Sequence, residues 1–351
     1  MANDGYDILD QALAPLGDTG PSLTNGFVNH APMVAEALVA MGQCAAALPW
    51  VRAHLHDTMP EEKPSNFLNQ SDWADGWQQT LGNNAHSAKW RAFFAQELET
   101  GDWQAVLNLW SFRLAPGLFA AATHGIIRVG HAVRALAVQD TPLRRRELSE
   151  GLALWAAAYQ TLPEDRQSRE TFLAPGDALK QVPLLPKEFR KNEGSITIAL
   201  EQLHEVPEFA PVIGMIDLQE NSGDLANAVA TVFAQVFLDQ THSPLSAIVY
   251  THSITAVAAI LNISSHASEE TLCELLAYGW QAASGLYCAY GFFPGPGPGV
   301  MEVESELAIA EKAVVHGDDH VIKLSEACLA LYGRTGDRRF LMVPARARAL
   351  L

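Results

Sequence analysis

The stretch from residue 318 to residue 331 constrains this chain most strongly, because a helix there carries two polar side chains on its apolar face. Asp318 or Asp319 can cap such a helix. Its apolar residues recur at helical spacing, at Leu324, Ala327, Cys328 and Leu331. His320 and Lys323 share that face, so both side chains are predicted to point into the core. An isolated ammonium is costly in a low-dielectric interior, so Lys323 needs an anionic partner or must lose its proton.

The rest of the chain favours packed helices. Of its 351 residues, 48% are hydrophobic and 18% are charged, and alanine-rich runs outnumber β-branched ones. We predict an all-α fold in which residues 1–351 form a single multi-helix globular domain. Residues 164–192 contain several prolines and are expected to form an irregular excursion, and the alternating Pro and Gly of residues 291–299 predict a loop.

The charge balance limits the partners of the chain. Its 40 acidic and 23 basic residues give a formal net charge of −17, which argues against a nucleic-acid surface and against an anionic membrane. The longest uninterrupted apolar runs fall well short of the roughly 20 residues that a transmembrane helix needs, so no membrane is expected. The sequence indicates no oligomeric state.

The cysteines and the N-terminus bear on the compartment. The four cysteines show no paired spacing and lie in Ala- and Leu-rich contexts, where a free cysteine behaves as a small hydrophobic residue. The N-terminus begins with acidic residues and lacks the basic and apolar regions of a secretory signal. We therefore expect a cytoplasmic protein.

Four histidines stand inside apolar helical segments that are far apart in the sequence, the first in a helix predicted from Phe27. They are His30, His124, His252 and His320. Any one of them could be an ordinary core histidine that is hydrogen-bonded to a neighbour. Four on different helices are harder to satisfy one by one, whereas a single metal ion held between facing helices would satisfy all of them. Neutral imidazole suits iron, copper, zinc and nickel, so the ligand type does not identify the metal.

Two further polar residues lie on the same stripe as His124. An alanine-rich helix is predicted to begin at Pro116, and within it Arg128 follows His124 by four residues and His131 follows it by seven. A buried arginine needs a carboxylate, a carbonyl or a ligand nearby. His316, four residues before His320, is a rival to Lys323 as a ligand, although its place before the helix cap makes it more exposed.

Around these histidines the chain resembles the questin oxidase-like family. The resemblance rests on four segments, which are Asn29-His30-Ala31-Pro32-Met33, Thr123-His124-Gly125-Ile126-Ile127-Arg128, Tyr250-Thr251-His252-Ser253-Ile254-Thr255-Ala256 and Asp319-His320-Val321-Ile322-Lys323. It extends from about Phe27 to Tyr332 with similar spacing between the segments. The segments are specific as a set and weak one by one.

The resemblance implies an oxygenase. The family includes fungal enzymes that open the ring of anthraquinones by a Baeyer–Villiger-type oxidation with NADPH, and a related non-haem iron dioxygenase whose metal is held by four histidines and a carboxylated lysine. Carried over by position, it implies Fe(II) ligands at His30, His124, His252 and His320, and a CO2-derived carbamate on Lys323. A buried lysine has a depressed pKa, so its neutral amine can add CO2 and offer the metal an anionic oxygen.

Three functions follow as hypotheses. The leading one is a non-haem iron oxygenase that uses O2 to cleave or hydroxylate a hydrophobic polycyclic aromatic such as an anthraquinone, with Arg128 and His131 orienting a phenolate or quinone oxygen. The first alternative is a zinc hydrolase with the same ligands. The second is a metal-free helical protein that binds a small molecule. NADPH is a candidate reductant without sequence support, because no G-x-G-x-x-G or G-x-x-x-x-G-K-[ST] motif is present.

Overall fold

The computed structural model describes residues 5–60, 76–166, 172–191, 194–218, 221–292 and 303–351. Within these ranges the fold is all-α, as predicted, with one small antiparallel sheet formed by β1 (Thr19–Leu23) and β2 (Thr58–Pro60). The α-helices are α1 (Tyr6–Leu13), α2 (Ala31–Ala40), α3 (Cys44–His54), α5 (Ser87–Thr100), α6 (Trp103–Leu114), α7 (His124–Val138), α8 (Pro142–Ala157), α9 (Pro175–Leu179), α10 (Ile196–Glu201), α11 (Ser222–Gln240), α12 (Pro244–Ile263), α13 (Glu269–Tyr290), α14 (Glu306–His316), α15 (Asp319–Thr335) and α16 (Arg339–Arg348). Short 3-10 turns cover Ala14–Leu16, Leu55–Asp57, Trp77–Thr80, Asn84–His86, Ala115–Gly117, Lys187–Phe189, Gln202–Glu205 and Pro207–Gly214.

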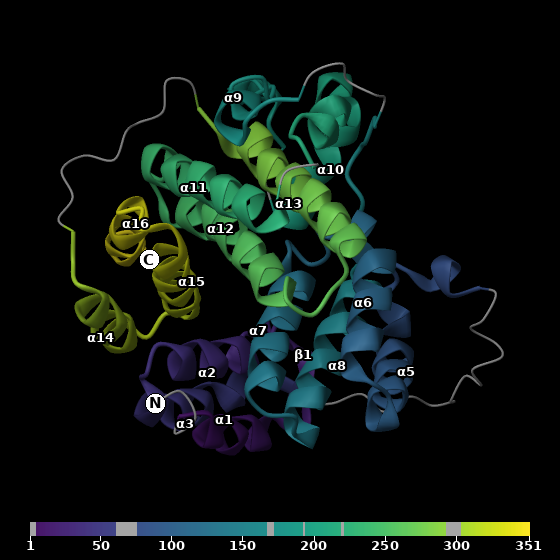
Figure 1. Ribbon diagram of the computed structural model, residues 1–351, viewed down its shortest axis with the longest axis vertical. Helices are drawn as coiled ribbons and strands as arrows, with labels where there is room; N and C mark the ends of the chain where they lie inside the picture. Colours follow the sequence, from purple (N-terminus) through teal and green to yellow (C-terminus); the bar gives the residue numbers. More distant parts are fainter. Residues whose placement is uncertain (1–4, 61–75, 167–171, 192–193, 219–220, 293–302) are drawn as a thin grey trace.

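Helix α12 lies at the centre of the molecule (Figure 1). Ser243 and Ser246 cap each other at its start, and Pro244 occupies its first turn, so the sequence fixes where the helix begins. Helices α7, α11, α13 and α15 pack against it, and its faces are therefore mostly buried. By length and composition alone this helix of 20 residues is apolar enough to cross a membrane, and 78% of its most apolar window is buried inside the protein.

Two glycines allow α7 to lie very close to its neighbours. A Cβ atom on Gly130 would lie 2.6 Å from the Cα of Ala259 in α12, and one on Gly125 would lie 2.7 Å from the Cβ of Trp155 in α8. Larger residues would push these helices apart. On the other side of α12, α15 packs against both α12 and α2, so segments from the two ends of the chain lie side by side (Figure 1).

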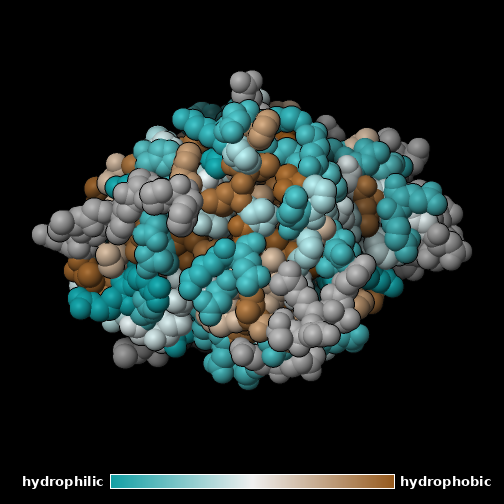
Figure 2. Space-filling view, turned by 90° about the horizontal axis from the view of Figure 1, so that it is seen from above, coloured by the Kyte–Doolittle hydropathy of each residue, from teal (hydrophilic) through white to brown (hydrophobic). Residues whose placement is uncertain are grey.

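The buried apolar residues of all these helices form one continuous hydrophobic core, from Tyr6 to Ala347. Hydrophobic residues also reach the surface in the middle of the face that Figure 2 shows from above. The boundary predicted at residue 1 lies outside the described residues and stays a prediction. The four cysteines are free thiols in this structure.

The prediction that a helix begins at Pro116 is wrong. Residues Ala115–Gly117 form a 3-10 turn, and α7 begins only at His124. Between them Ala121, Ala122 and Thr123 have φ angles of 49°, 55° and 69°. A left-handed conformation costs a residue with a Cβ roughly 1–2 kcal/mol, and the alanine-rich sequence gives no sign of it.

Other expected boundaries also shift. Helix α2 begins at Ala31 and not at Phe27, so His30 is its N-cap. The stretch before it contains β1. The described part of the excursion at residues 164–192 contains α9 and one 3-10 turn. Of the loop predicted at residues 291–299, only residues 291–292 are described, and the remainder lies outside the described ranges.

Candidate metal centre

Four helices bring the four predicted histidines together. His30 is the N-cap of α2, His124 is the first residue of α7, His252 lies in the middle of α12 and His320 is the second residue of α15. The Nε2 atom of His124 lies 2.6 Å from Nε2 of His30 and 3.4 Å from Nε2 of His252. The ring of His320 has its centroid 5.0 Å from that of His30 and 5.7 Å from that of His252.

Three of these histidines stand at helix N-termini, where local sequence sets the backbone. Asp318 caps α15, because its carboxylate accepts from the backbone N–H groups of His320 and Val321. Pro32 lies in the first turn of α2, where its fixed φ favours the start of a helix. The left-handed turn at residues 121–123 places the Ala121 carbonyl next to the ring of His124, and such strained turns are concentrated at functional sites.

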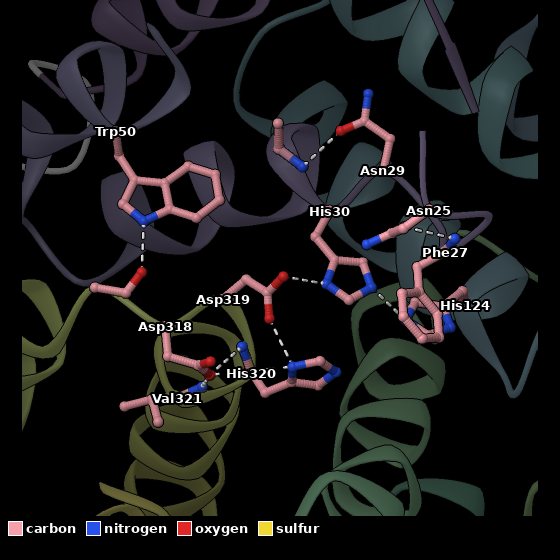
Figure 3. A network of polar contacts seen from close by, with 12 residues as sticks. Asn25, Phe27, Asn29, His30, Trp50, His124, Asp318, Asp319, His320 and Val321 are labelled. Carbon is pink, nitrogen blue, oxygen red and sulfur yellow. Dashed lines mark hydrogen bonds and ion pairs between the residues drawn. The ribbon is translucent and has the colours of Figure 1, made fainter. Parts of the chain in front are cut away.

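One carboxylate holds the rings of two of the histidines. Asp319 accepts from Nδ1 of His30 through one oxygen and from Nδ1 of His320 through the other, each at 2.6 Å (Figure 3). Burial raises the pKa of Asp319, but the neighbouring His30, His320 and Lys323 outweigh it and hold this pKa well below its usual range. Asp319 is therefore ionised and can only accept hydrogen bonds.

Backbone carbonyls hold the other two rings. The Ala121 carbonyl accepts from Nδ1 of His124 at 2.5 Å, and the Ile248 carbonyl accepts from Nδ1 of His252 at 2.8 Å. A carbonyl oxygen can only accept, so each Nδ1 must carry the hydrogen. His124 and His252 thus have their hydrogen on Nδ1, which leaves the lone pair of the neutral ring on Nε2. The oxygens of the ionised Asp319 likewise only accept, so Nδ1 of His30 and Nδ1 of His320 also carry a hydrogen.

The Nε2 atoms of His30 and His124 face each other at 2.6 Å, while the Nδ1 atom of each ring already has another partner. Burial and the neighbouring Lys323 lower the pKa of His30 to about 3, although Asp319 raises it. Burial and nearby histidines likewise hold the pKa values of His124 and His252 well below the usual range, so a proton does not bridge the rings at neutral pH. Candidate ligand atoms of His30, His124 and His320 all lie within 4.8 Å of one another. A set of converging imidazole lone pairs fits a transition-metal ion.

Lys323 is buried beside this cluster, one turn after His320, with 3% of its surface exposed. Burial lowers its pKa to about 8, although Asp319 and Asp318 raise it. Its charge helps to lower the pKa values of the histidines, which places the amine close to them. In the part of the chain that the structure describes, no salt bridge joins Lys323 to a carboxylate. Because Lys323 is buried, its side chain is not solvated. Its carboxylation stays a prediction.

A family model for proteins described as questin oxidase-like matches residues 27–328, which is most of the chain. The chain belongs to this family. The matched range includes the four clustered histidines and Lys323. A comparison with curated proteins finds no match.

In this questin oxidase-like protein, Arg128 and His131 are bound to carboxylates outside the cluster. Nε and Nη2 of Arg128 donate to Glu147 at 3.0 and 2.7 Å, and Nδ1 of His131 lies 2.6 Å from Glu36. The cavity between these residues has about 10 Å³ open to the centre of a water molecule. That is room for about one water and not for an aromatic ring. Substrate orientation by these two residues stays a prediction.

Sequence reasoning missed the role of Asp319 in this family member. Asp318 and Asp319 were equal candidates for the helix cap, and the structure assigns the cap to Asp318 and leaves Asp319 to bind two rings. The sequence signal that could have indicated this role is the pair of adjacent aspartates, because one carboxylate is enough to cap the helix. The rival ligand His316 is exposed at the end of α14 and does not join the cluster.

Proposed function

We propose that this protein is a non-haem iron oxygenase that acts on a hydrophobic polycyclic aromatic, such as an anthraquinone. The observation that carries the proposal is the convergence of imidazole Nε2 lone pairs with every Nδ1–H already bound to an acceptor. The ring hydrogens on Nδ1 are already donated elsewhere, so a metal cation between the rings would satisfy the Nε2 lone pairs. Membership of the questin oxidase-like family supports the choice of an oxygenase.

His30, His124, His252 and His320 would hold Fe(II) through Nε2. Iron in this position would supply the redox chemistry that activates O2, which the side chains themselves do not supply. The protein's own contribution is to fix the four rings and to exclude water from them. His30 and His252 are 7% and 2% exposed, so the surrounding helices shield the site. The side chain of His320 is 15% exposed and Asp319 is 27% exposed, so we propose that O2 and the substrate enter past the start of α15.

Lys323 would supply an anionic ligand as a carbamate. The neutral amine attacks CO2, a bond forms between Nζ and the CO2 carbon, and one proton is released to solvent. The pKa of about 8 leaves part of the amine neutral near pH 7.5. Three helix N-termini meet at the site, at the starts of α2, α7 and α15, and their positive partial charge favours a negative group there.

NADPH and further partners belong to the same proposal. NADPH is a candidate reductant, to be tested by its effect on turnover. The proposed partners are a small aromatic molecule and O2, and the net charge of −17 argues against nucleic acid or an anionic membrane as a partner. We also propose a cytoplasmic location, which the free cysteines support.

The test is metal analysis of protein purified without an affinity tag, followed by measurement of O2 consumption on addition of an anthraquinone. The proposal predicts stoichiometric iron and O2 uptake that depends on the aromatic substrate. Stoichiometric zinc with hydrolysis in the absence of O2 would favour the zinc hydrolase instead. Protein that binds no metal under any condition would leave the metal-free binding protein as the better reading.

The ligand set is tested by His320→Ala, which should bind less than the stoichiometric metal of the parent protein. Full metal occupancy in this variant would show that the proposed ligand set is wrong. The carbamate is tested by adding bicarbonate during reconstitution with Fe(II). Bicarbonate should raise metal retention in the parent protein and not in Lys323→Arg, whose guanidinium stays protonated.

A further inference from the structure

Asp319 contacts two of the clustered histidine rings at once. Its two carboxylate oxygens bind two different rings, His30 from the start of α2 and His320 from its own helix, each at 2.6 Å. These two rings come from opposite ends of the chain, 290 positions apart in sequence number. Figure 3 shows the carboxylate lying between them.

We propose that Asp319 is the positioning residue of the metal centre, and that it makes His30 and His320 ligands as a pair. The inference rests on the metal centre of the proposed function and deepens it. A ring bound at Nδ1 by a carboxylate has its proton fixed there, and its Nε2 is presented as a lone pair in a set direction. One carboxylate that does this for two rings makes the two ligands depend on each other.

This position requires a group with two acceptor oxygens, which a carboxylate provides. A carboxamide offers one acceptor oxygen and one donor nitrogen. In Asp319→Asn the oxygen can still accept from one Nδ1–H, but the NH2 group must donate to the other ring. That ring would take the opposite tautomer, with its hydrogen on Nε2, and could no longer bind a metal through this atom. One substitution at the carboxylate is therefore expected to remove one ligand.

The neighbouring residue provides a matched control. Asp318 is also a carboxylate at the start of α15, but it accepts from the backbone N–H groups of His320 and Val321. Its Oδ1 lies 4.0 Å from Nδ1 of His320, which is too far for a hydrogen bond. Asp318→Asn removes the same charge, and asparagine is an equally good N-cap. A loss seen in Asp319→Asn and not in Asp318→Asn thus reports the two ring contacts, and not the charge or the helix cap.

The experiment measures binding of Co²⁺ alone to metal-free protein, by competition with a chromophoric chelator. We expect Asp319→Asn to weaken Co²⁺ binding about 10–100-fold, the usual cost of losing a group that orients a metal ligand. Its Co²⁺ spectrum should report fewer nitrogen ligands. Asp318→Asn should bind as the parent does. Equal weakening in both variants, or none in either, would overturn the proposal.

A second measurement does not depend on metal, and its first part uses only the parent protein. NMR of the metal-free parent protein, labelled with ¹⁵N in histidine, reports the tautomer of each ring. The proposal predicts that His30 and His320 carry their hydrogen on Nδ1, and that one of them changes tautomer in Asp319→Asn. Hydrogen on Nε2 in the parent would overturn it. Failure of the parent to bind any metal would instead defeat the proposed function, while the tautomers still decide the role of Asp319.

Discussion

Two polar clusters lie along the same pair of helices, α2 and α7, and they are built on opposite principles. At the starts of these helices stand His30 and His124, whose Nε2 lone pairs face each other at 2.6 Å. Further along, Glu36 of α2 accepts from Tyr6 at 2.7 Å and from Arg134 of α7 at 2.8 Å, and lies 2.6 Å from Nδ1 of His131. The first cluster gathers imidazole bases beside the amine of Lys323, and the second pairs carboxylates with an arginine.

The charges of the second cluster are mutually compensated. Burial raises the pKa of Glu36, but Arg134 and His131 outweigh it and keep this pKa well below the usual range. Arg134 also pairs with Glu326 of α15, and these carboxylates hold its pKa above the usual value although burial lowers it. The comparison teaches that burial of polar residues does not by itself mark a functional site. The metal site that we propose rests instead on four like groups, the imidazoles, that converge from four helices.

The largest effect should come from breaking the compensated cluster. Glu36→Ala leaves Arg134 facing a single carboxylate and Tyr6 without its acceptor, and should lower the free energy of unfolding by about 3–5 kcal/mol. Chemical denaturation measures this. The control is Asp140→Ala, which breaks the more exposed pair with Arg145 and should cost about 0–1 kcal/mol. Equal losses in the two variants would remove the distinction between a buried network and a surface pair.

Removal of a ligand should affect metal binding and leave the fold nearly intact. His252→Ala should weaken Co²⁺ binding by at least about 100-fold, the upper cost of losing even an orienting group. The free energy of unfolding of the metal-free protein should fall only by the amount expected for a buried side chain cut to alanine, because the lost ring leaves a cavity and no longer donates to Ile248. His242→Ala, outside the cluster, is the control and should bind Co²⁺ as the parent does. Unchanged binding in His252→Ala would contradict the assignment of His252.

A smaller effect is expected at the edge of the compensated cluster. Tyr6→Phe removes the hydroxyl that donates to Glu36 and should lower the free energy of unfolding by roughly 1.5–3 kcal/mol, the usual value of a hydrogen bond to a charged group. Tyr332→Phe is the control, since the Tyr332 hydroxyl has no hydrogen bond within the described residues. Co²⁺ binding should be unchanged in both variants. A loss of metal affinity in Tyr6→Phe would show that the two clusters are coupled.

The pH dependence of stability should report the histidine cluster. The pKa of His30 is about 3 in the folded protein and about 6.5 in the unfolded chain, so the unfolded chain binds more protons between these values. The contribution of His30 to the free energy of unfolding is therefore fully present above pH 6.5 and is lost as the pH falls towards 3. The thermal midpoint of metal-free protein should fall from pH 7.5 to pH 5.5, and less so in His252→Ala. A flat profile for the parent would show that the rings are not held neutral by burial.

Helical periodicity predicted much of the fold and of the site. The apolar spacing after His320 predicted that this residue and Lys323 lie on a buried face of α15. In the structure Lys323 is buried and His320 is partly buried. The all-α class followed from composition and the scarcity of β-branched runs. These features depend on local spacing, which a sequence displays directly.

Other parts of the site depend on tertiary contacts that no local pattern contains. His124 and His131 stand on one stripe of α7, yet one faces three other histidines and the other binds Glu36. The left-handed turn before His124 lies in an alanine-rich stretch, and that composition by itself favours a helix. The carboxylate partners of Arg128 and His131 come from α8 and α2, and periodicity cannot choose among the acidic residues of the chain.

The central claim is that four imidazole Nε2 atoms converge to hold one metal ion. The most direct test is a crystal structure of protein loaded with Fe(II) without oxygen, with anomalous diffraction recorded at the iron edge. We predict a single iron peak bonded to Nε2 of all four histidines, with every Nδ1 still bound to Asp319 or to a backbone carbonyl. The absence of iron from this site, or iron bound through Nδ1, would contradict the account.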